Sequence, residues 1–348
     1  MIRTWGEELE KHYDCYLTFS EDFLLKDKKK NLLHKILHNV YNNLKGIFKN
    51  KTHRYSLFGN YTCPRYKKPP LFYLNGAPRH TKKAQLSFDI TIEMSYYFQY
   101  TAELPFSATK KLVGIYTDSF PHDGPFLDLK KKRDVRTLNR AEFYKEYLEK
   151  YDGIILGNLN LVAQYRPLSD KLTFANGAYR QEDYIENNGV GMHKHLTIGW
   201  TGNPDRPMKG FREVIEPTIK ILQDSGLDIR LKTQFSGSFE SLLSFYTDVD
   251  LIIIASYADT SPSLFSEACL SNVPCISTEI GFPKMVIKNQ VNGILVNRDI
   301  NEIVKAVKDV YTDREKLMRF SRRIKKDYLE VLDNKISINN LLNCLKSL

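Results

Sequence analysis

The chain contains, at residues 251–270, the stretch LIIIASYADTSPSLFSEACL. Its first five residues are apolar, which is typical of a strand that is buried on both faces of a parallel sheet. A polar loop follows from Ser256 to Ser261, and Pro262 then predicts the first position of a helix. A buried strand that leads through a short loop into a helix is the repeating unit of doubly wound α/β folds.

The same alternation extends outward from this stretch in both directions. Further strands are expected at residues 111–116, 153–157, 196–200, 227–232, 274–277 and 293–296, and helices at residues 135–150, 158–165, 210–224 and 239–247. The polar segment 187–195, with its Asn-Asn-Gly, predicts a linker between the two groups of elements. The sequence therefore predicts an α/β protein with two Rossmann-like halves.

The length of the chain agrees with this division, because 348 residues are typical of two domains. We expect a first domain over residues 1–190 and a second over residues 191–325. A C-terminal helix at residues 326–348 is expected to pack back toward the first domain.

A loop at residues 199–211, GWTGNPDRPMKGF, joins an expected strand to an expected helix. Gly202 and Gly210 allow close backbone approach, and the N-terminus of the helix favours an anion. Arg206 and Lys209 add positive charge where a diphosphate could bind. Neither of the common glycine-rich phosphate motifs is present, so a polar surface loop is the alternative interpretation.

Two acids, Asp259 and Glu267, lie on either side of the expected start of the helix that follows residue 261. The carboxyl end of a buried strand is where ligands bind in doubly wound folds, and a carboxylate there can accept hydrogen bonds from sugar hydroxyls. The amides of the first helical turn are available to an anion. The alternative is that Asp259 caps a turn and Glu267 is solvated.

Taken together, these stretches resemble the retaining GT-B glycosyltransferases of glycosyltransferase family 4. The matching segments, in order, are residues 174–178, 199–211, 245–251, 256–267, 268–278 and 292–296. The resemblance covers residues 174–330 and implies the GT-B fold, in which two Rossmann-like domains face a central cleft. Residues 1–110 match only loosely.

The resemblance assigns roles to individual residues. Lys209 matches the family's diphosphate-binding lysine, Glu267 the acid that grips the ribose, and Asp259 the acid near the transferred sugar, which is usually glutamate. Asn203 stands where the family usually has arginine, and Arg206 is expected to supply the missing charge. The full expected donor site is Gly202, Asn203, Arg206, Lys209, Thr260, Ser261, Ser263, Leu264 and Glu267.

The expected chemistry follows from the charge that develops on the leaving diphosphate. Lys209, Arg206 and helix amides could stabilise this charge without a metal ion, and no cofactor is expected besides the donor itself. The resemblance implies retention of the anomeric configuration, with the acceptor hydroxyl attacking on the face of the leaving group.

The loop after residues 111–116 is expected to face the acceptor, and Asp118 and His122 are its candidate catalytic residues, beside Asp259 and Lys209. An ordinary loop histidine is the alternative for His122. The chain opens with an expected helix at residues 1–10 and a strand at residues 15–19, where the family normally has an apolar strand first. We therefore expect that either the chain is a segment of a longer protein, or its first domain is remodelled and lacks the usual first strand.

Charge and composition limit the partners. The net charge is +10, and residues 1–195 hold 31 Lys and Arg against 22 Asp and Glu. Apolar residues at helical spacing from Leu32 to Phe48, flanked by lysines, predict a basic amphipathic helix within residues 26–54. Such a helix could lie on an anionic membrane surface or pack on its own domain. Five scattered cysteines without a CxxC pair favour a reducing, cytoplasmic location.

The function expected from all of this is the transfer of a sugar from a nucleotide-diphospho-sugar to a glycan or lipid-linked acceptor. A bacterial surface polysaccharide, such as a capsule or lipopolysaccharide, or a glycolipid is the expected product, made at the inner face of the membrane. Two alternatives remain at this point: a degenerate GT-B module that binds a nucleotide sugar or glycan without turnover, and a basic nucleic-acid-binding protein. No nucleic-acid reader motif supports the second, so we expect no nucleic-acid partner.

Overall fold

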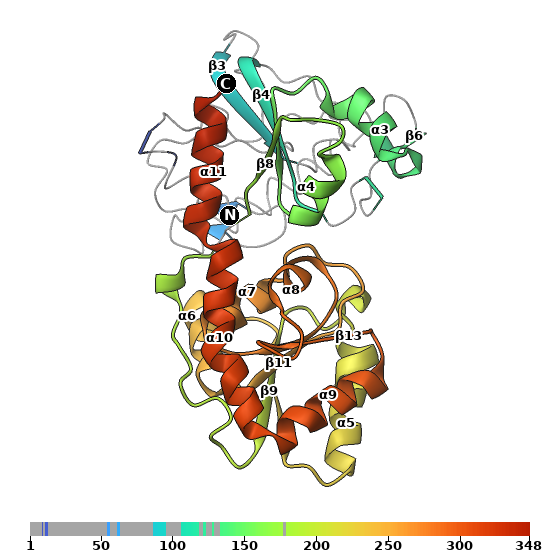
Figure 1. Cartoon of the computed structure of the whole chain (residues 1–348), viewed down its shortest axis with the longest axis vertical. Helices are drawn as coiled ribbons and strands as arrows, with labels where there is room; N and C mark the ends of the chain where they lie inside the picture. The colour runs from blue at the N-terminus through green and yellow to red at the C-terminus, as the bar shows by residue number, and fades with distance from the viewer. Residues whose placement is uncertain are drawn as a thin grey trace, which may run out of the picture.

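The computed structural model describes residues 9, 11–12, 54–55, 61–62, 86–94, 106–117, 121–122, 127–128, 133–176 and 179–348. Two parallel sheets lie one above the other in the view of Figure 1, each with helices packed around it. The larger sheet belongs to the C-terminal half of the chain and carries the site described below.

Five strands form this larger sheet, and every neighbouring pair in it is parallel. The strands are β9 (Leu196–Thr201), β10 (Ile229–Gln234), β11 (Leu251–Ile254), β12 (Cys275–Thr278) and β13 (Ile294–Val296). Their order in space is β10-β9-β11-β12-β13, so the direction in which strands are added reverses between β9 and β11. Such a reversal leaves a crevice at the carboxyl ends of the two strands, where ligands bind in open α/β sheets.

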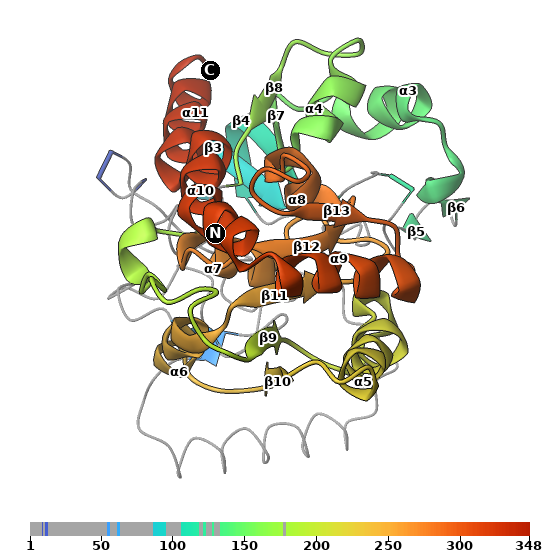
Figure 2. The same ribbon diagram turned by 60° about the horizontal axis from the view of Figure 1, so that its bottom comes forward.

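Helices cover both faces of this sheet. They are η6 (Pro207–Lys209), η7 (Phe211–Ile215), α5 (Glu216–Asp224), α6 (Phe239–Phe245), η8 (Tyr246–Asp248), α7 (Ser263–Leu270), α8 (Gly281–Val286), α9 (Ile300–Thr312) and α10 (Arg314–Leu332). Figure 2 shows α5 and α9 on one side of the sheet and α6 and α7 on the other. The all-isoleucine segment of β11 is fully or almost fully buried between them, as its apolar sequence predicts.

The second sheet is parallel and has four strands, whose order in space is β3-β4-β7-β8. Its strands are β3 (Leu86–Met94), β4 (Phe106–Ile115), β7 (Gly153–Leu156) and β8 (Leu172–Phe174). The helices around it are η3 (Val135–Thr137), α3 (Arg140–Phe143), η4 (Tyr144–Leu148) and α4 (Leu159–Tyr165), whereas η5 (Gln181–Asp183) leads into Tyr184, which is buried in the core of the larger sheet. Two short antiparallel pairs, β1 (Arg54–Tyr55) with β2 (Tyr61–Thr62) and β5 (Leu127–Asp128) with β6 (Arg133–Asp134), complete the described strands.

The last helix, α11 (Asn334–Lys346), packs on the second sheet. The Asn176 backbone N–H donates to Ser337 Oγ at 3.1 Å, and Asn340 Nδ2 donates to the Phe174 carbonyl at 3.0 Å. Figure 1 shows α10 and α11 following one another along the same side of the molecule. The helix expected at residues 326–348 is thus two helices, because Asp333 leaves the helical conformation and its carboxylate caps α11.

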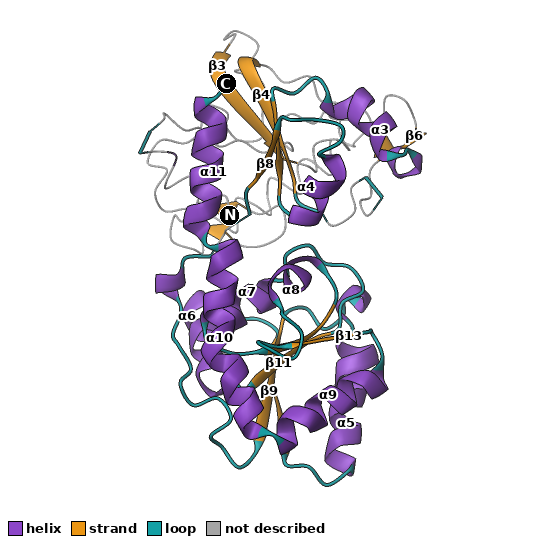
Figure 3. Cartoon of the chain, in the orientation of Figure 1, coloured by secondary structure: helices purple, strands orange, loops and turns teal. Residues whose placement is uncertain are grey.

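Most expected elements are present, with shifted ends. The strand expected at residues 227–232 is β10, two residues further along the chain, and β4 begins five residues before its expected start at 111. The helix expected at residues 135–150 is broken into three pieces, because Asn139 and Glu142 form a capping box that starts α3 afresh. Figure 3 shows how helices and loops alternate with the strands of both sheets.

The linker expected at residues 187–195 carries no regular element and is held by Asp250. The buried Asp250 carboxylate accepts hydrogen bonds from the Gly191 N–H at 2.7 Å and the Thr197 N–H at 2.8 Å. This acid therefore anchors the chain before β9. The helix expected within residues 26–54 and the strand expected at residues 15–19 lie outside the described residues, except that Arg54 begins β1. Of the helix expected at residues 1–10, only Leu9 is described.

Candidate functional site

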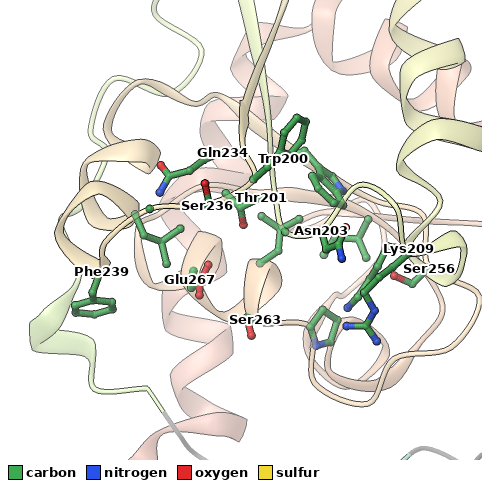
Figure 4. A pocket seen from close by; sticks show the side chains of 18 of the residues that line it. Trp200, Thr201, Asn203, Lys209, Gln234, Ser236, Phe239, Ser256, Ser263 and Glu267 are labelled. Carbon is green, nitrogen blue, oxygen red and sulfur yellow. The ribbon is translucent and has the colours of Figure 1, made fainter. Parts of the chain in front are cut away.

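A pocket with a volume of about 400 Å³ opens at the carboxyl ends of β9, β10 and β11, where the strand order reverses (Figure 4). Its lining residues come from the ends of β9, β10 and β11, from the three loops that follow these strands, and from α6 and α7. They are Trp200, Thr201, Gly202, Asn203, Arg206, Lys209, Gln234, Phe235, Ser236, Gly237, Ser238, Phe239, Leu242, Ile254, Ser256, Pro262, Ser263, Leu264 and Glu267. The pocket lies where the doubly wound topology predicts a ligand site.

The loop between β9 and η7 forms one wall of the pocket. The Asn203 side chain accepts a hydrogen bond from the Asp205 N–H at 2.9 Å, which makes a local turn. The chain then passes through η6 to Gly210, whose φ of +69° favours glycine. A Cβ at this position would lie 2.6 Å from the Ala255 carbonyl oxygen, so the loop can only approach β11 this closely with glycine.

Lys209 lies on this wall, and its ammonium group forms an ion pair with the Asp259 carboxylate. The side chains of the two residues are 24% and 15% exposed, so the pair is only partly open to solvent. The two loops that carry them are also joined through their backbones, because the Tyr257 N–H donates to the Met208 carbonyl at 3.1 Å. Lys209 lines the pocket, whereas Asp259 lies behind it as the partner of the lysine.

Glu267 lies on the opposite side of the pocket from Lys209, and Ser263 lies between them in Figure 4. Its side chain is buried, and the Tyr246 hydroxyl donates a hydrogen bond to its Oε2 at 2.7 Å. Burial raises the pKa of Glu267 to about 7, although the Tyr246 hydrogen bond opposes that rise. A carboxylate that titrates near neutral pH in a pocket is a typical sign of a functional site.

The first turn of α7 contributes Ser263 and Leu264 to the lining. The amides of a first helical turn have no acceptor within the helix and favour an anion. Thr260 and Ser261, which were expected to contact the donor, lie outside the lining. The Thr260 carbonyl accepts from the Phe282 N–H at 3.0 Å, so this part of the loop packs against α8.

The loop after β10 supplies lining residues that sequence analysis missed. Phe235, Ser236, Gly237 and Ser238 belong to it, and Gln234 at the end of β10 and Phe239 at the start of α6 flank it. The ring of Phe235 lies 5.4 Å from that of Phe211 and 6.1 Å from that of Trp200, and it is nevertheless 49% exposed. Exposed phenylalanines in a Ser-Gly-Ser loop directly after a strand are a signal that would have pointed to the pocket, had the strand been placed correctly.

Of the two candidate catalytic residues of the first half, His122 does not line this pocket. His122 is exposed, and its Nδ1 is hydrogen-bonded to the Arg136 carbonyl at 3.0 Å. Asp118 lies outside the described residues. The roles expected for both residues, and for Asp259, Thr260 and Ser261, stay predictions.

In the part of the chain that the structure describes, no three His, Cys, Asp or Glu side chains gather so as to hold a metal ion. Over the same residues, no helix combines the length and apolarity that crossing a bilayer requires.

Comparison with known proteins places this geometry in a family context. Residues 220–327 match the family model described as Glycosyl transferases group 1. The match includes α7 and therefore Glu267, and it begins after the Lys209 loop. No curated protein sequence matches the chain.

Three solved structures with the same fold are distant from this chain in sequence. TarM, from S. aureus, is 16% identical with a TM-score of 0.51, over 73% of this chain and 54% of TarM. Sucrose-phosphate synthase from Thermosynechococcus elongatus is 12% identical with a TM-score of 0.51, over 68% of this chain and 67% of that protein. HepE from Anabaena, in complex with UDP-glucose, is 12% identical with a TM-score of 0.51, over 69% of this chain and 72% of HepE.

The chain spans about half the length of TarM. At these identities the likeness establishes the fold, and the pocket, the lysine loop and the acid of α7 are this chain's own. The chain thus has the fold of the GT-B glycosyltransferases, and its residues 220–327 match the Glycosyl transferases group 1 family.

Proposed function

We propose that this protein is a glycosyltransferase whose donor is a nucleotide-diphospho-sugar bound in the pocket at the ends of β9, β10 and β11. The observation that carries the proposal is the placement of Lys209 and Glu267 on opposite sides of one pocket at the reversal of strand order. The lysine suits a diphosphate, and the buried acid suits a pair of ribose hydroxyls.

The remaining lining fits the rest of such a donor. Phe235 and Phe239 are half exposed at the pocket, where a nucleobase could stack on an aromatic ring. Ser263 and Leu264 bring the first turn of α7 to the side where the phosphates would lie. Structures of HepE contain UDP-glucose or UDP with glucose, so uridine is the base to test first.

In the proposed reaction, the bond between the anomeric carbon and the diphosphate breaks as a bond to the acceptor oxygen forms, and the proton of the acceptor hydroxyl passes to the departing diphosphate. Negative charge then grows on the departing diphosphate, and Lys209, Arg206 and the α7 amides stabilise it without a metal ion. We propose retention of configuration, with the acceptor approaching from the face of the leaving group. Asp259 is proposed to contact the transferred sugar, and Asp118 and His122 to act on the acceptor side.

The proposed acceptor is a glycan or a lipid-linked glycan of a bacterial surface polysaccharide or glycolipid. The basic excess in residues 1–195 supports binding at the inner, anionic face of a membrane from the cytoplasm. Pull-down of the protein by anionic but not neutral liposomes, reversed by salt, is the expected result. Equal binding to both kinds of liposome, or none to either, would contradict the electrostatic proposal.

A second candidate is a binding module that holds a nucleotide sugar without turnover. Two features favour it: the Asn203 side chain is engaged in its own turn, and the Lys209 charge is already met by Asp259. Detection of sugar transfer or donor hydrolysis that disappears in Glu267→Ala would eliminate this candidate.

The experiment that tests the proposal is thermal unfolding with UDP, GDP, ADP, CDP and TDP, each with and without magnesium. A ligand at 100 times its Kd stabilises the folded state by about 2.7 kcal/mol, which raises Tm by a few degrees. The expected result is stabilisation by one nucleotide, independent of magnesium, followed by transfer from the matching nucleotide sugar. If none of the five nucleotides stabilises the protein, the proposed donor class is wrong.

A further inference from the structure

Arg298 lies outside the pocket, in the connection between β13 and α9, and reaches across to two other loops. Its Nε donates to the Ala255 carbonyl at 2.8 Å, and its Nη2 donates to the Pro207 carbonyl at 3.3 Å. These two carbonyls belong to the loop after β11 and to the loop after β9. A single guanidinium therefore joins three connections at the carboxyl end of the sheet.

The backbone at Arg298 is held by the residues on either side of it. The Asn297 N–H and Nδ2 donate to the Glu302 carboxylate at 2.9 and 2.8 Å. The Asp299 side chain caps α9 by accepting from the Glu302 N–H at 3.0 Å. Because both neighbours are fixed to the first turn of α9, the guanidinium is presented from a rigid base.

The joined loops are those that carry the Lys209–Asp259 ion pair. Pro207 precedes Lys209 by two residues, and Ala255 precedes Asp259 by four. The Arg298 guanidinium also lies 5.6 Å from the centre of the exposed Tyr257 ring. A Cβ on Gly210 would lie 3.0 Å from Arg298 Nη2, so the guanidinium also packs against the end of the lysine loop.

We propose that Arg298 is a positioning residue, which sets the place of Lys209 relative to α7 and thereby the site of the donor diphosphate. The expected effect on diphosphate binding rests on the proposed function. The attachment of the two loops by Arg298 does not depend on it. The planar fork of arginine can serve two carbonyls from fixed directions, whereas a lysine offers one flexible ammonium group. Arg298 touches no part of the proposed donor, so its effect passes through Lys209.

The effect on binding is expected to be specific to phosphate. When the lysine loop is freed, the diphosphate loses an aligned charge, whereas the contacts of the base and ribose with Phe235 and Glu267 are unaffected. Because a misaligned charge-assisted contact loses part of its strength, we expect Arg298→Ala to weaken nucleoside diphosphate binding roughly 10-fold. Binding of the matching nucleoside monophosphate, which lacks the second phosphate, is expected to change much less.

The test compares the affinities of the full chain for the mono- and diphosphate of the base that stabilises it, measured by calorimetry. The variants compared are Arg298→Ala, Arg298→Lys, Lys209→Ala and the double variant Lys209→Ala/Arg298→Ala. The control is Arg230→Ala. Arg230 is an exposed arginine on β10 whose partner, Asp228, is 4.0 Å away. We expect a selective loss of diphosphate affinity in Arg298→Ala and a partial recovery of that affinity in Arg298→Lys. Adding Arg298→Ala to Lys209→Ala is expected to cause no further loss.

Equal loss for both nucleotides, or losses that add in the double variant, would overturn the inference. Amide hydrogen exchange of the unliganded protein tests the attachment of the loops by Arg298 independently of the proposed function. Faster exchange of residues 206–210 and 255–259 in Arg298→Ala but not in Arg230→Ala is expected, and unchanged exchange in both would overturn the attachment. If the wild type binds no nucleoside diphosphate while the exchange result holds, the proposed function fails and the attachment stands.

Discussion

Replacement of Glu267 by glutamine is expected to stabilise the unliganded protein at alkaline pH while it weakens donor binding. The carboxyl group is buried, and its pKa is raised to about 7 from the ordinary value of 4.5 because burial penalises its charge. The native state therefore binds more protons than the unfolded state between about pH 4.5 and 7. Stability contributed by this group is present below pH 4.5 and is lost as the pH rises to about 7.

The size of this loss follows from the shift. At 1.36 kcal/mol per pKa unit, a rise from 4.5 to about 7 corresponds to about 3 kcal/mol of lost stability at pH 8. Glutamine has a similar size, does not titrate, and offers an amide oxygen to the Tyr246 hydroxyl. The difference in unfolding free energy between Glu267→Gln and the wild type is thus expected to move by about 3 kcal/mol in favour of the variant between pH 4.5 and 8.

The assay is urea unfolding of both proteins at several pH values, with Glu213→Gln as the matched control because Glu213 is exposed. Tyr246→Phe provides a second check: loss of its hydrogen bond is expected to raise the Glu267 pKa further and to shift the pH window upward. A difference between Glu267→Gln and the wild type that is constant from pH 4.5 to 8 would refute the reasoning. The same variant is expected to bind nucleoside diphosphate on the order of 10-fold more weakly, since a hydrogen bond to a charged group is lost.

Three further predictions concern the pocket walls. Lys209→Ala is expected to weaken nucleoside diphosphate binding by about 10- to 100-fold, the value of a charge-assisted contact, and calorimetry measures this. Asp259→Asn removes the charge that competes for Lys209, so calorimetry is expected to show tighter diphosphate binding while the rate of sugar transfer falls. Gly210→Ala is expected to destabilise the fold by 2 kcal/mol or more in urea unfolding, since its φ of +69° is strained for alanine and its Cβ would approach the Ala255 carbonyl to 2.6 Å. Unchanged binding in the first two variants, or unchanged stability in the third, would show that these contacts are incidental.

Much of the C-terminal half could be predicted from the sequence, because its strands are apolar runs bounded by strong turn signals. The isoleucines of β11, Pro262 before α7 and Pro274 before β12 each mark an element on their own. The same signals placed Lys209 and Glu267 in loops and helices that meet at one edge of the sheet. The prediction of a ligand site there rested on topology, which short-range patterns specify well, whereas its assignment to a nucleotide-sugar donor rested on the resemblance to glycosyltransferase family 4.

The first half was less predictable for a physical reason. Its helices are short, and in residues 135–150 local capping by Asn139 divides a segment whose apolar periodicity looks continuous. The end of β10 was missed by two residues because Thr233 and Gln234 are polar, and the pairing of β10 with β9 carries the strand that far. Because of this error, the loop that carries Phe235 was not recognised as directly following the end of β10, and its place in the pocket was not predicted.

The spacing of residues along the chain could not predict which side chains reach into the pocket. The separation of Asp259 and Glu267 along the chain suggested two acids that both face the donor. In the structure the shorter acid forms an ion pair with Lys209 behind the pocket, and the other is buried against Tyr246. Asp259 therefore neutralises the charge of Lys209 before any ligand binds. The buried Glu267 has a pKa of about 7, so it is partly protonated at neutral pH. Under the proposed function, a diphosphate would have to compete with Asp259 for Lys209. That exchange would release the Asp259 carboxylate, which lies outside the pocket lining, for its proposed contact with the transferred sugar.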